Sequence, residues 1–394
     1  MSERFVNPRI AAIPPSGIRK FFNLAGTIKN AISLGIGEPD FVTPYHIRET
    51  MIDSLLNGET QYTENRGMLS LRKEIARYLE DRHNVKYNPE TDIVVTIGAS
   101  EAIDIVLRAT LREGDEVLLP DPGYVSYKPC VEMCGGVGIP VKTYAEDAFQ
   151  ITGQALEEKI TPRTRALILS YPNNPTGAIL EDEYLRQVAD VAIRHDLLVI
   201  CDEIYNELVY DGLRQTSLAS LQGMWERTVT INGFSKAFAM TGHRIGYFCA
   251  PQPIADAALK IHQYTILCAG RSAQAAAIHA LKTGRENGYE DVIQMRESYN
   301  RRRRLMHHAF NDMGLTCFEP RGAFYAFPCI QYTGLDSETF CARLLNEQAV
   351  VCIPGNAFGE SGEGFIRCCY ATDQEKMLEA FKRMRAFLAT LREE

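Results

Sequence analysis

The sequence of 394 residues is longer than one ordinary hydrophobic core needs, and it predicts two domains. Hydrophobic residues make up 45% of the chain and charged residues 23%, which is typical of a globular protein and excludes a disordered one. The formal net charge of −8 argues against a general affinity for nucleic acid or anionic membranes, though not against a local cationic pocket.

The 11 cysteines have no regular spacing and no histidine cluster near them. We interpret them as reduced thiols and not as a disulfide framework or a metal site. The first residues lack the apolar core of a signal peptide, and no apolar run reaches the roughly 18 residues that cross a membrane. These features predict a soluble, cytoplasmic protein without a metal centre.

Residues 1–45 are rich in turn-forming residues. The run Leu34-Gly35-Ile36-Gly37-Glu38-Pro39-Asp40 has two glycines two positions apart, which could expose backbone to a ligand; a tight surface turn is the alternative. Apolar periodicity then predicts helices over residues 47–56 and 69–81. Tyr62 lies in the loop between these helices.

Strands and helices alternate from residue 91 onward. Strands are predicted at residues 92–97, 117–119, 166–170, 197–202 and 228–231, with helices at 101–111 and 183–195. Apolar strands separated by helices indicate a mainly parallel sheet covered on both faces, in which ligands bind beyond the carboxyl ends of the strands. The residues that follow strand ends in this way predict a site there: Ser100, Tyr124, Asn174, Asp202 and Lys236.

The pattern becomes α+β beyond about residue 285. A long charged helix is predicted over residues 291–313, followed by short strands within 322–327, 350–353 and 364–368 and a helix from about residue 373. The long helix contains Arg301-Arg302-Arg303-Arg304, which we interpret as a solvated helix face and not as an anion-binding patch. We predict a large domain at residues 47–288 and a smaller α+β domain built from residues 1–46 and 289–394.

Lys236 follows the β-branched strand at residues 228–231, in a segment with few other ionisable groups. A lysine at the end of a buried strand is partly desolvated, which lowers its pKa and frees the amine to attack a carbonyl. The alternative is a lysine that reaches solvent from the strand end. If Lys236 binds an aldehyde cofactor such as pyridoxal phosphate, the other strand-end residues can be tested against the needs of that cofactor.

The phosphate of such a cofactor needs N–H groups at a helix N-terminus, and Gly98-Ala99-Ser100 opens a helix. The ring nitrogen needs a carboxylate, and Asp202 ends an apolar strand. A carboxylate there is costly to bury without a cationic partner; the alternative is a helix N-cap, with residues 203–205 beginning a helix.

Further residues match the remaining needs of the cofactor and of a substrate. Asn174 and Tyr205 could donate to the ring oxygen, and Tyr124 could stack on the ring, although either tyrosine could equally be an ordinary core or surface residue. Arg244 is placed to neutralise the phosphate. Arg367 lies within an apolar strand and could hold a substrate carboxylate through a bidentate fork.

Six motifs occur together over nearly the whole chain. They are Gly35-Ile36-Gly37-Glu38-Pro39-Asp40-Phe41, Tyr62-Thr63-Glu64-Asn65-Arg66-Gly67, Tyr171-Pro172-Asn173-Asn174-Pro175-Thr176-Gly177, Cys201-Asp202-Glu203-Ile204-Tyr205, Ser235-Lys236 with Arg244-Ile245-Gly246-Tyr247, and Arg367. In this order and spacing the chain resembles the class I/II aminotransferases of the aspartate aminotransferase family, of pyridoxal-phosphate fold type I. It is most similar to the branch with Ile-Pro-Pro-Ser-Gly-Ile-Arg near the N-terminus, here residues 13–19.

The resemblance implies a large domain with a mainly parallel seven-stranded sheet, pyridoxal 5'-phosphate as cofactor and a homodimer with shared active sites. Lys236 would form the Schiff base with the cofactor and act as general acid–base. The phosphate-binding residues implied are Ala99, Ser100, Ser235 and Arg244, with Tyr62 reaching the phosphate of the other subunit. The ring contacts implied are Asp202 to the nitrogen, Asn174 and Tyr205 to the oxygen, and Tyr124 to the face. Gly37 and Arg367 would bind the substrate carboxylate.

The resemblance also implies cis bonds before Pro122 and Pro175. It implies ping-pong transfer of an amino group between an amino acid and a 2-oxo acid, with aspartate or an aromatic amino acid as donor and 2-oxoglutarate as acceptor. A carbon–sulfur β-lyase would use the same lysine, aspartate and arginine and is the alternative.

Two positions depart from the family pattern. His243 stands where a tryptophan is common. Arg271 lies in a segment that in relatives approaches the site of the partner subunit. Either Arg271 adds positive charge near that pocket, favouring a dicarboxylic substrate or the phosphate, or it is an ordinary arginine at the dimer interface.

Overall fold

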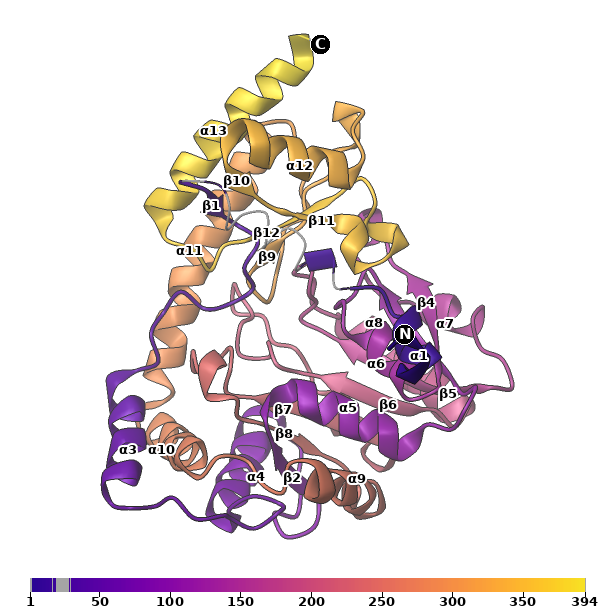
Figure 1. The fold of residues 1–394 in the computed structure, drawn as a ribbon, viewed down its shortest axis with the longest axis vertical. Coiled ribbons are helices and arrows are strands. Elements are labelled where there is room, and N and C mark those ends of the chain that lie inside the picture. Colours follow the sequence, from indigo (N-terminus) through magenta and orange to yellow (C-terminus); the bar gives the residue numbers. More distant parts are fainter. Residues whose placement is uncertain (1, 16, 19–27, 29, 394) are drawn as a thin grey trace.

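The computed structural model describes residues 2–15, 17–18, 28 and 30–393 (Figure 1). Within the motif at residues 13–19, Ser16 and Arg19 lie outside the described residues. A large sheet with its helices occupies the lower part of Figure 1, and the C-terminal elements lie above it. The long helix α11 (Glu290–Asp312) runs along one side and joins the two parts.

The large sheet has seven strands in the order β2-β8-β7-β6-β5-β3-β4. The strands are β2 (Ile93–Thr96), β3 (Glu116–Asp121), β4 (Val137–Lys142), β5 (Thr164–Ser170), β6 (Leu198–Asp202), β7 (Thr228–Gly233) and β8 (Gly246–Cys249). Strand β8 is antiparallel to both of its neighbours, and the other neighbouring pairs are parallel. The prediction of a mainly parallel seven-stranded sheet is confirmed.

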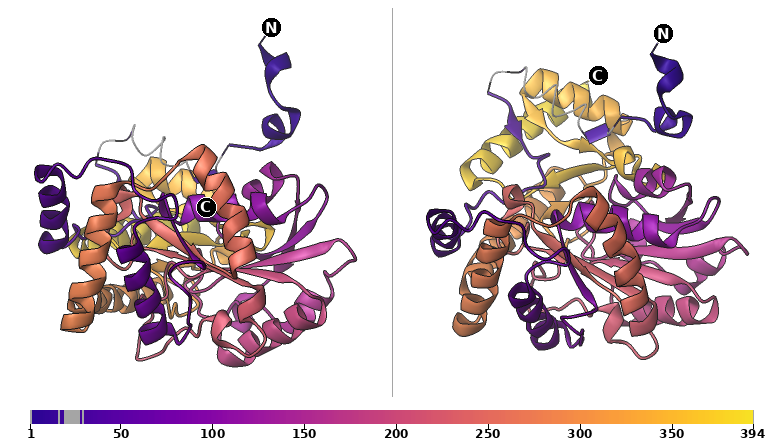
Figure 2. Two further views of the ribbon diagram at one scale, coloured as in Figure 1. Left: turned by 90° about the horizontal axis from the view of Figure 1, so that it is seen from below. Right: turned by 60° about the horizontal axis from the view of Figure 1, so that its bottom comes forward.

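Helices cover both faces of this sheet (Figure 2). Along β5, Ala166 and Ile168 belong to a core with helices α5 (Gly98–Thr110), α6 (Tyr127–Met133) and α9 (Gln252–Thr265). The alternating residues Leu167 and Leu169 belong to a second core with α7 (Gly153–Glu157), α8 (Asp182–Arg194) and α11. Because successive side chains of a strand point to opposite faces, an apolar run such as β5 is what burial on both sides requires.

A third core lies under α3 (Tyr45–Leu56), α4 (Leu69–His83) and α10 (Arg271–Asn287), against β2 and β8. The two helices predicted before residue 91 are therefore confirmed. The N-terminal helix α1 (Pro8–Ala12) has no buried residue and projects at the edge of the molecule in Figure 2, where Arg9 pairs with Glu113.

The C-terminal part contains two small sheets. Strand β1 (Ile32–Ser33) is parallel to β10 (Val350–Val351), and β11 (Ile353–Pro354), β12 (Ile366–Cys369) and β9 (Tyr325–Ala326) form an antiparallel sheet. Helices α12 (Ser337–Gln348) and α13 (Gln374–Glu393) pack against them. The bounds predicted for the two domains stay a prediction.

The strand predicted over residues 322–327 is shorter than expected: only Tyr325 and Ala326 form a strand, and Gly322 makes an isolated bridge to Val209. The backbone before them is used elsewhere: Gly322 N–H donates to Gly177 O at 2.8 Å and Ala323 N–H to Leu208 O at 2.9 Å. These bonds fix a loop, because a donor that is already paired cannot extend a ladder.

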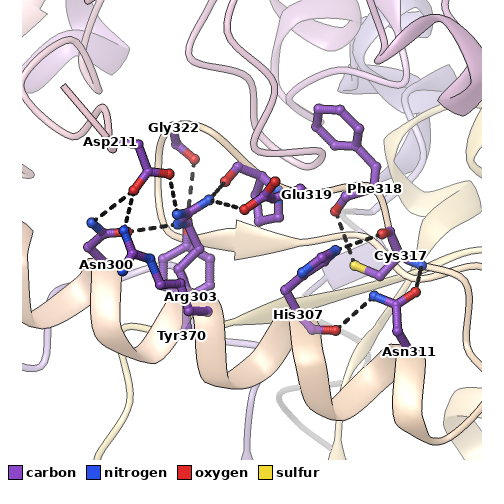
Figure 3. A network of polar contacts seen from close by, with 12 residues as sticks. Asp211, Asn300, Arg303, His307, Asn311, Cys317, Phe318, Glu319, Gly322 and Tyr370 are labelled. Carbon is purple, nitrogen blue, oxygen red and sulfur yellow. Dashed lines mark hydrogen bonds and ion pairs between the residues drawn. The ribbon is translucent and has the colours of Figure 1, made fainter. Parts of the chain in front are cut away.

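The interpretation of the arginine run as a solvated face is wrong at Arg303, which is 1% exposed (Figure 3). Its guanidinium donates to Asp211 at 2.5 Å, to Glu319 at 3.1 Å and to the backbone oxygen of Pro320 at 2.8 Å. The helical period turns one of four consecutive residues toward the core, and here that residue meets carboxylates of its own chain.

One of the two predicted cis bonds is present, between Asp121 and Pro122. The one predicted before Pro175 is wrong, because the cis bond in that turn joins Tyr171 and Pro172. Both prolines permit a cis bond at low cost, so the sequence of the turn does not distinguish them. None of the helices in the described part of the chain is long and apolar enough to cross a membrane.

Candidate active site

Polar side chains from several strand ends surround one cavity of about 420 Å³ at the carboxyl edge of the large sheet. Strands β2, β3, β5, β6 and β7 end at this edge because they run in one direction, and Arg244 reaches it because antiparallel β8 begins there. The cavity is lined by these predicted residues: Gly37, Ala99, Ser100, Tyr124, Asn174, Asp202, Tyr205, Ser235, Lys236, Arg244 and Arg367.

Lys236 follows β7 and its side chain lies in the cavity. Its Nζ donates to the backbone oxygen of Gly37 at 2.7 Å and lies 5.8 Å from the ring centroid of Tyr205. Burial lowers the pKa of Lys236 to about 8. About a tenth of its amine is therefore unprotonated at pH 7, far more than for an ordinary lysine, and the unprotonated amine is the nucleophilic form.

Asp202 ends β6 and is 6% exposed. Its Oδ2 accepts the hydroxyl of Tyr127 at 2.8 Å and its Oδ1 accepts the N–H of Ile204 at 3.2 Å. Burial raises the pKa of Asp202, and these two bonds and the charge of Lys236 oppose that rise. The N-cap alternative is wrong, since residues 204–207 form a turn and no helix.

Arg367 lies on β12 and is 2% exposed. One guanidinium nitrogen donates to Asn174 Oδ1 at 2.9 Å and another to the backbone oxygen of Gly35 at 2.6 Å. The group also lies over the rings of Tyr325 and Phe358, 4.5 and 4.7 Å from their centroids. Its Nε is buried and has no hydrogen-bond partner among the described residues, which leaves a donor for a bound anion.

Gly37 is in tight contact with the side chain of Tyr325. A Cβ added to Gly37 would lie 2.2 Å from the Tyr325 hydroxyl oxygen, so no larger residue fits unless the chain moves. The hydroxyls of Tyr325 and Tyr205 are 2.8 Å apart. The glycine is therefore explained by close approach of its backbone to the cavity wall and to Lys236.

Helix α5 begins at Gly98, so Ala99 and Ser100 lie in its first turn. The guanidinium of Arg244 packs over Gly98, where a Cβ would lie 2.4 Å from one of its nitrogens. Arg244 also donates to the backbone oxygen of Thr241 at 3.0 Å. A helix N-terminus beside a fixed guanidinium is a site for a phosphate or another anion.

Tyr62 and Arg271 do not line this cavity; they lie in a separate hollow. Tyr62 is 80% exposed, and Arg271 Nε is 3.9 Å from Glu59 Oε2. His243 does not line the cavity either; its Nε2 is 3.4 Å from the Thr43 hydroxyl, and burial lowers its pKa.

Sequence reasoning missed several side chains that line the cavity, among them Tyr127, Tyr325, Glu38 and Thr241. Glu38 and Thr241 stand beside predicted residues and bind each other through a hydrogen bond. Their nearness to Gly37 and Arg244 was the available signal. Tyr325 lies in the apolar run at residues 323–327, where a tyrosine is indistinguishable from a core residue, and Tyr127 has no motif beside it.

The fold and this cavity define an α/β protein that holds a lysine of lowered pKa and a buried carboxylate in one cavity at the carboxyl edge of its large sheet. Comparison with known proteins identifies the family. The model of the family described as aminotransferase class I and II matches residues 29–384. The chain belongs to this family, and it is an aminotransferase that depends on pyridoxal phosphate and acts on amino acids and 2-oxo acids.

Three relatives show the degree of similarity. Aromatic-amino-acid aminotransferase 2 of Thermococcus litoralis is 44% identical over 383 residues, 97% of this chain and 98% of the relative. The aspartate aminotransferase of Pyrococcus abyssi is 44% identical over the same shares. The crystal structure of an aromatic aminotransferase from Pyrococcus horikoshii is 45% identical, with a TM-score of 0.90 over 94% of this chain and 99% of that one.

The residues present fit the cofactor of this family. Asp202 is a buried carboxylate without an ion pair among the described residues, as a partner for a protonated ring nitrogen would be. The first turn of α5 offers N–H donors beside Arg244. Lys236 lies in the same cavity with an amine of lowered pKa.

Proposed function

We propose that this aminotransferase transfers the amino group of aspartate or an aromatic amino acid to 2-oxoglutarate by a ping-pong mechanism. The observation that carries the proposal is Lys236, whose pKa of about 8 and position between Gly37 and Tyr205 suit covalent chemistry with an aldehyde. The donor is proposed from the relatives, which are named for aspartate or for aromatic amino acids.

Pyridoxal phosphate, when bound, supplies an aldehyde that condenses with amines and a protonated ring that accepts electrons. Lys236 would hold the cofactor through its aldehyde. Its Nζ, once displaced by the substrate amine, would serve as the acid–base group for the α-proton of the substrate. Asp202 keeps the ring nitrogen protonated, and the Tyr127 hydroxyl fixes the orientation of Asp202.

The substrate carboxylate is bound by Arg367 and by the backbone near Gly37. Asn174 and the oxygen of Gly35 hold two arms of the Arg367 guanidinium, so the fork is oriented before substrate arrives. Its unpartnered Nε is the donor that a carboxylate would satisfy.

The remaining assignments concern the cofactor. We propose that the N–H groups of Ala99 and Ser100, the Ser235 hydroxyl and Arg244 hold the phosphate, which is supported by their shared position on the cavity wall. We propose that Asn174 and Tyr205 bind the ring oxygen and that Tyr124 stacks on the ring.

We also propose a cytoplasmic homodimer with shared active sites. Large apolar side chains are left exposed on one chain, including Phe5 at 78%, Tyr62 at 80% and Tyr264 at 84%, and a partner subunit would cover them. In this dimer Tyr62 contributes to the partner's phosphate site, and Arg271 lies near the partner's substrate. The cytoplasm is supported by the 11 cysteines, all of them free thiols.

A visible absorbance spectrum of the purified protein, titrated with a panel of amino acids, tests this function. Aspartate and aromatic amino acids should convert the cofactor at the lowest concentrations, and 2-oxoglutarate should reverse the change. Lys236→Ala should slow the conversion by about 100-fold or more, because the acid–base group is lost. Conversion at the wild-type rate in this variant would contradict the assignment of Lys236.

Release of pyruvate and ammonia without an amino acceptor would indicate a β-lyase instead. No relative described above is named for that reaction, so we do not propose it.

A further inference from the structure

Glu101 and His262 form a hydrogen-bonded pair behind the first turn of α5, the turn that lines the active-site cavity through Ala99 and Ser100. Glu101 Oε1 lies 2.6 Å from His262 Nδ1. The His262 side chain is fully buried, and that of Glu101 is 11% exposed. Neither residue lines the cavity.

The second oxygen of the carboxylate, Glu101 Oε2, accepts the backbone N–H of Ile97 at 2.5 Å. Ile97 is the N-cap residue of α5, and its apolar side chain makes no cap bond to the first turn. Glu101 therefore satisfies the cap N–H itself and leaves the N–H groups of Ala99 and Ser100 to an external acceptor. The arrangement secures the turn without using the donors that an anion needs.

The same turn is held from two other directions. The Thr96 hydroxyl donates to the backbone oxygen of Gly98 at 2.9 Å. Gly246 packs so closely that a Cβ on it would lie 2.7 Å from Ala99 N. Glu101 restrains the turn from a third side, by accepting the N–H of Ile97. Because hydrogen bonds weaken steeply with angle, a small rotation of this turn would weaken its grip on an anion.

A carboxylate in this turn also has an electrostatic cost, because it carries the same sign as a phosphate. His262 lies in the last turn of α9, and its Nδ1 meets the carboxylate of Glu101. Its Nε2 has no hydrogen-bond partner among the described residues, so the bond from Nδ1 to Glu101 is what orients the ring. The pair places a proton donor beside the charge of Glu101.

We propose that Glu101 and His262 are positioning residues for the cofactor phosphate. Glu101 fixes the turn whose Ala99 and Ser100 N–H groups receive the phosphate, and His262 orients Glu101 and offsets its charge. The inference rests on the proposed assignment of Ala99 and Ser100 to the phosphate.

The test compares how the full-length apoprotein binds pyridoxal phosphate and pyridoxal, which lacks the phosphate. Both compounds condense with Lys236. The dissociation constant of pyridoxal divided by that of pyridoxal phosphate therefore isolates the contribution of the phosphate, and this quotient is the ratio used below. Glu101→Ala should lower this ratio by about tenfold or more, the loss expected when a charged hydrogen bond is removed. Glu101→Gln keeps an oxygen for the Ile97 N–H and should stay within about threefold of wild type, the effect of a partial loss.

His262→Phe removes the bond to Glu101 while keeping a ring, and it should lower the ratio by roughly threefold or more. If Glu101→Ala does not fold, this variant decides the question. Asp104→Ala is the matched control, because it removes a half-buried carboxylate of the same helix, which pairs with Arg108 at 3.5 Å. It should leave the ratio unchanged.

Two outcomes would overturn the proposal. Equal weakening of both compounds in the Glu101 and His262 variants would show a general loosening of the fold. An unchanged ratio would show that the pair does not act on the phosphate. If the wild-type protein itself binds both compounds equally well, the phosphate assignment fails first, and this inference fails with it.

Discussion

Lys236 is the residue whose chemistry depends most on its surroundings. An exposed lysine would be almost fully protonated at neutral pH, whereas burial between Gly37 and the aromatic rings lowers the pKa of Lys236 to about 8. Raising the pH through this value deprotonates the amine and creates the nucleophile. Lowering it removes the nucleophile.

We therefore expect the rate at which pyridoxal phosphate attaches to the apoprotein to depend on pH with a midpoint near 8. The rate should rise about tenfold per pH unit below the midpoint and level off above it. Stopped-flow absorbance measures this rate, with Lys236→Ala as the control that shows no attachment. A rate that keeps rising beyond pH 9 would show a lysine with an ordinary pKa.

At this scale, the sequence predicted most of the polar residues of the cavity but missed Tyr127, Tyr325 and Glu38. Lys236, Asp202 and Arg367 could be predicted because a charge within an apolar strand or at its end is costly without a purpose. Tyr325 could not be predicted, because a tyrosine in an apolar run is usually part of a core, and Tyr127 stands between Ser126 and Lys128 with no motif beside it. Their roles depend on which hydroxyl meets which partner across the fold.

Helix α11 is the element whose role differs most from expectation. Its buried residue Arg303 binds Asp211, which lies in the segment between β6 and β7, and Glu319 (Figure 3). The residues after Glu319 lead to Tyr325 in the cavity wall. The charge in the middle of α11 therefore holds the loop that brings Tyr325 to the site.

Replacing Arg303 should destabilise the protein, because it leaves buried acceptors and a carboxylate without their partner. We expect Arg303→Ala to lower the free energy of unfolding by about 3 kcal/mol. Arg304 also pairs with Asp211, but its side chain is 65% exposed, so Arg304→Ala should cost less than about 1 kcal/mol. Urea denaturation of both variants measures the difference. Equal losses would mean that burial of Arg303 does not matter.

The strands of the large sheet were predicted from apolar runs, since burial on both faces requires them. The order of the strands and the single antiparallel strand β8 were not predicted, because no local pattern records which strands become neighbours. The side of α11 that faces the core was also hidden, since four consecutive arginines mask the helical period.

At the scale of the whole molecule, the family and its fold were predicted from the order and spacing of motifs that cover nearly the full chain. The separate hollow that contains Tyr62 and Arg271 is the part of the molecule whose proposed role requires a second subunit. Within one chain, these two residues take no part in the cavity around Lys236.

Mixed dimers test whether the sites are shared. Lys236→Ala chains and Tyr62→Ala chains, mixed and allowed to exchange, should regain activity at limiting cofactor. About one half of the sites in each mixed dimer would combine an intact Lys236 with an intact Tyr62 from the other chain. Mixing Lys236→Ala with Asp202→Ala is the control, because both residues belong to the same chain's site and no site is repaired. Activity no higher than the sum of the separate variants would contradict shared sites.

The pairing of β1 with β10 has a consequence for the order of events during synthesis. Ile32 leaves the ribosome long before its partner Val350 does, so the N-terminal strand has no place in a sheet until most of the chain has been made. Gly37 and Arg367 both lie in this late-forming part. A nascent chain can thus make all the strands of the large sheet, and Lys236, before β12 brings Arg367 to the proposed substrate site.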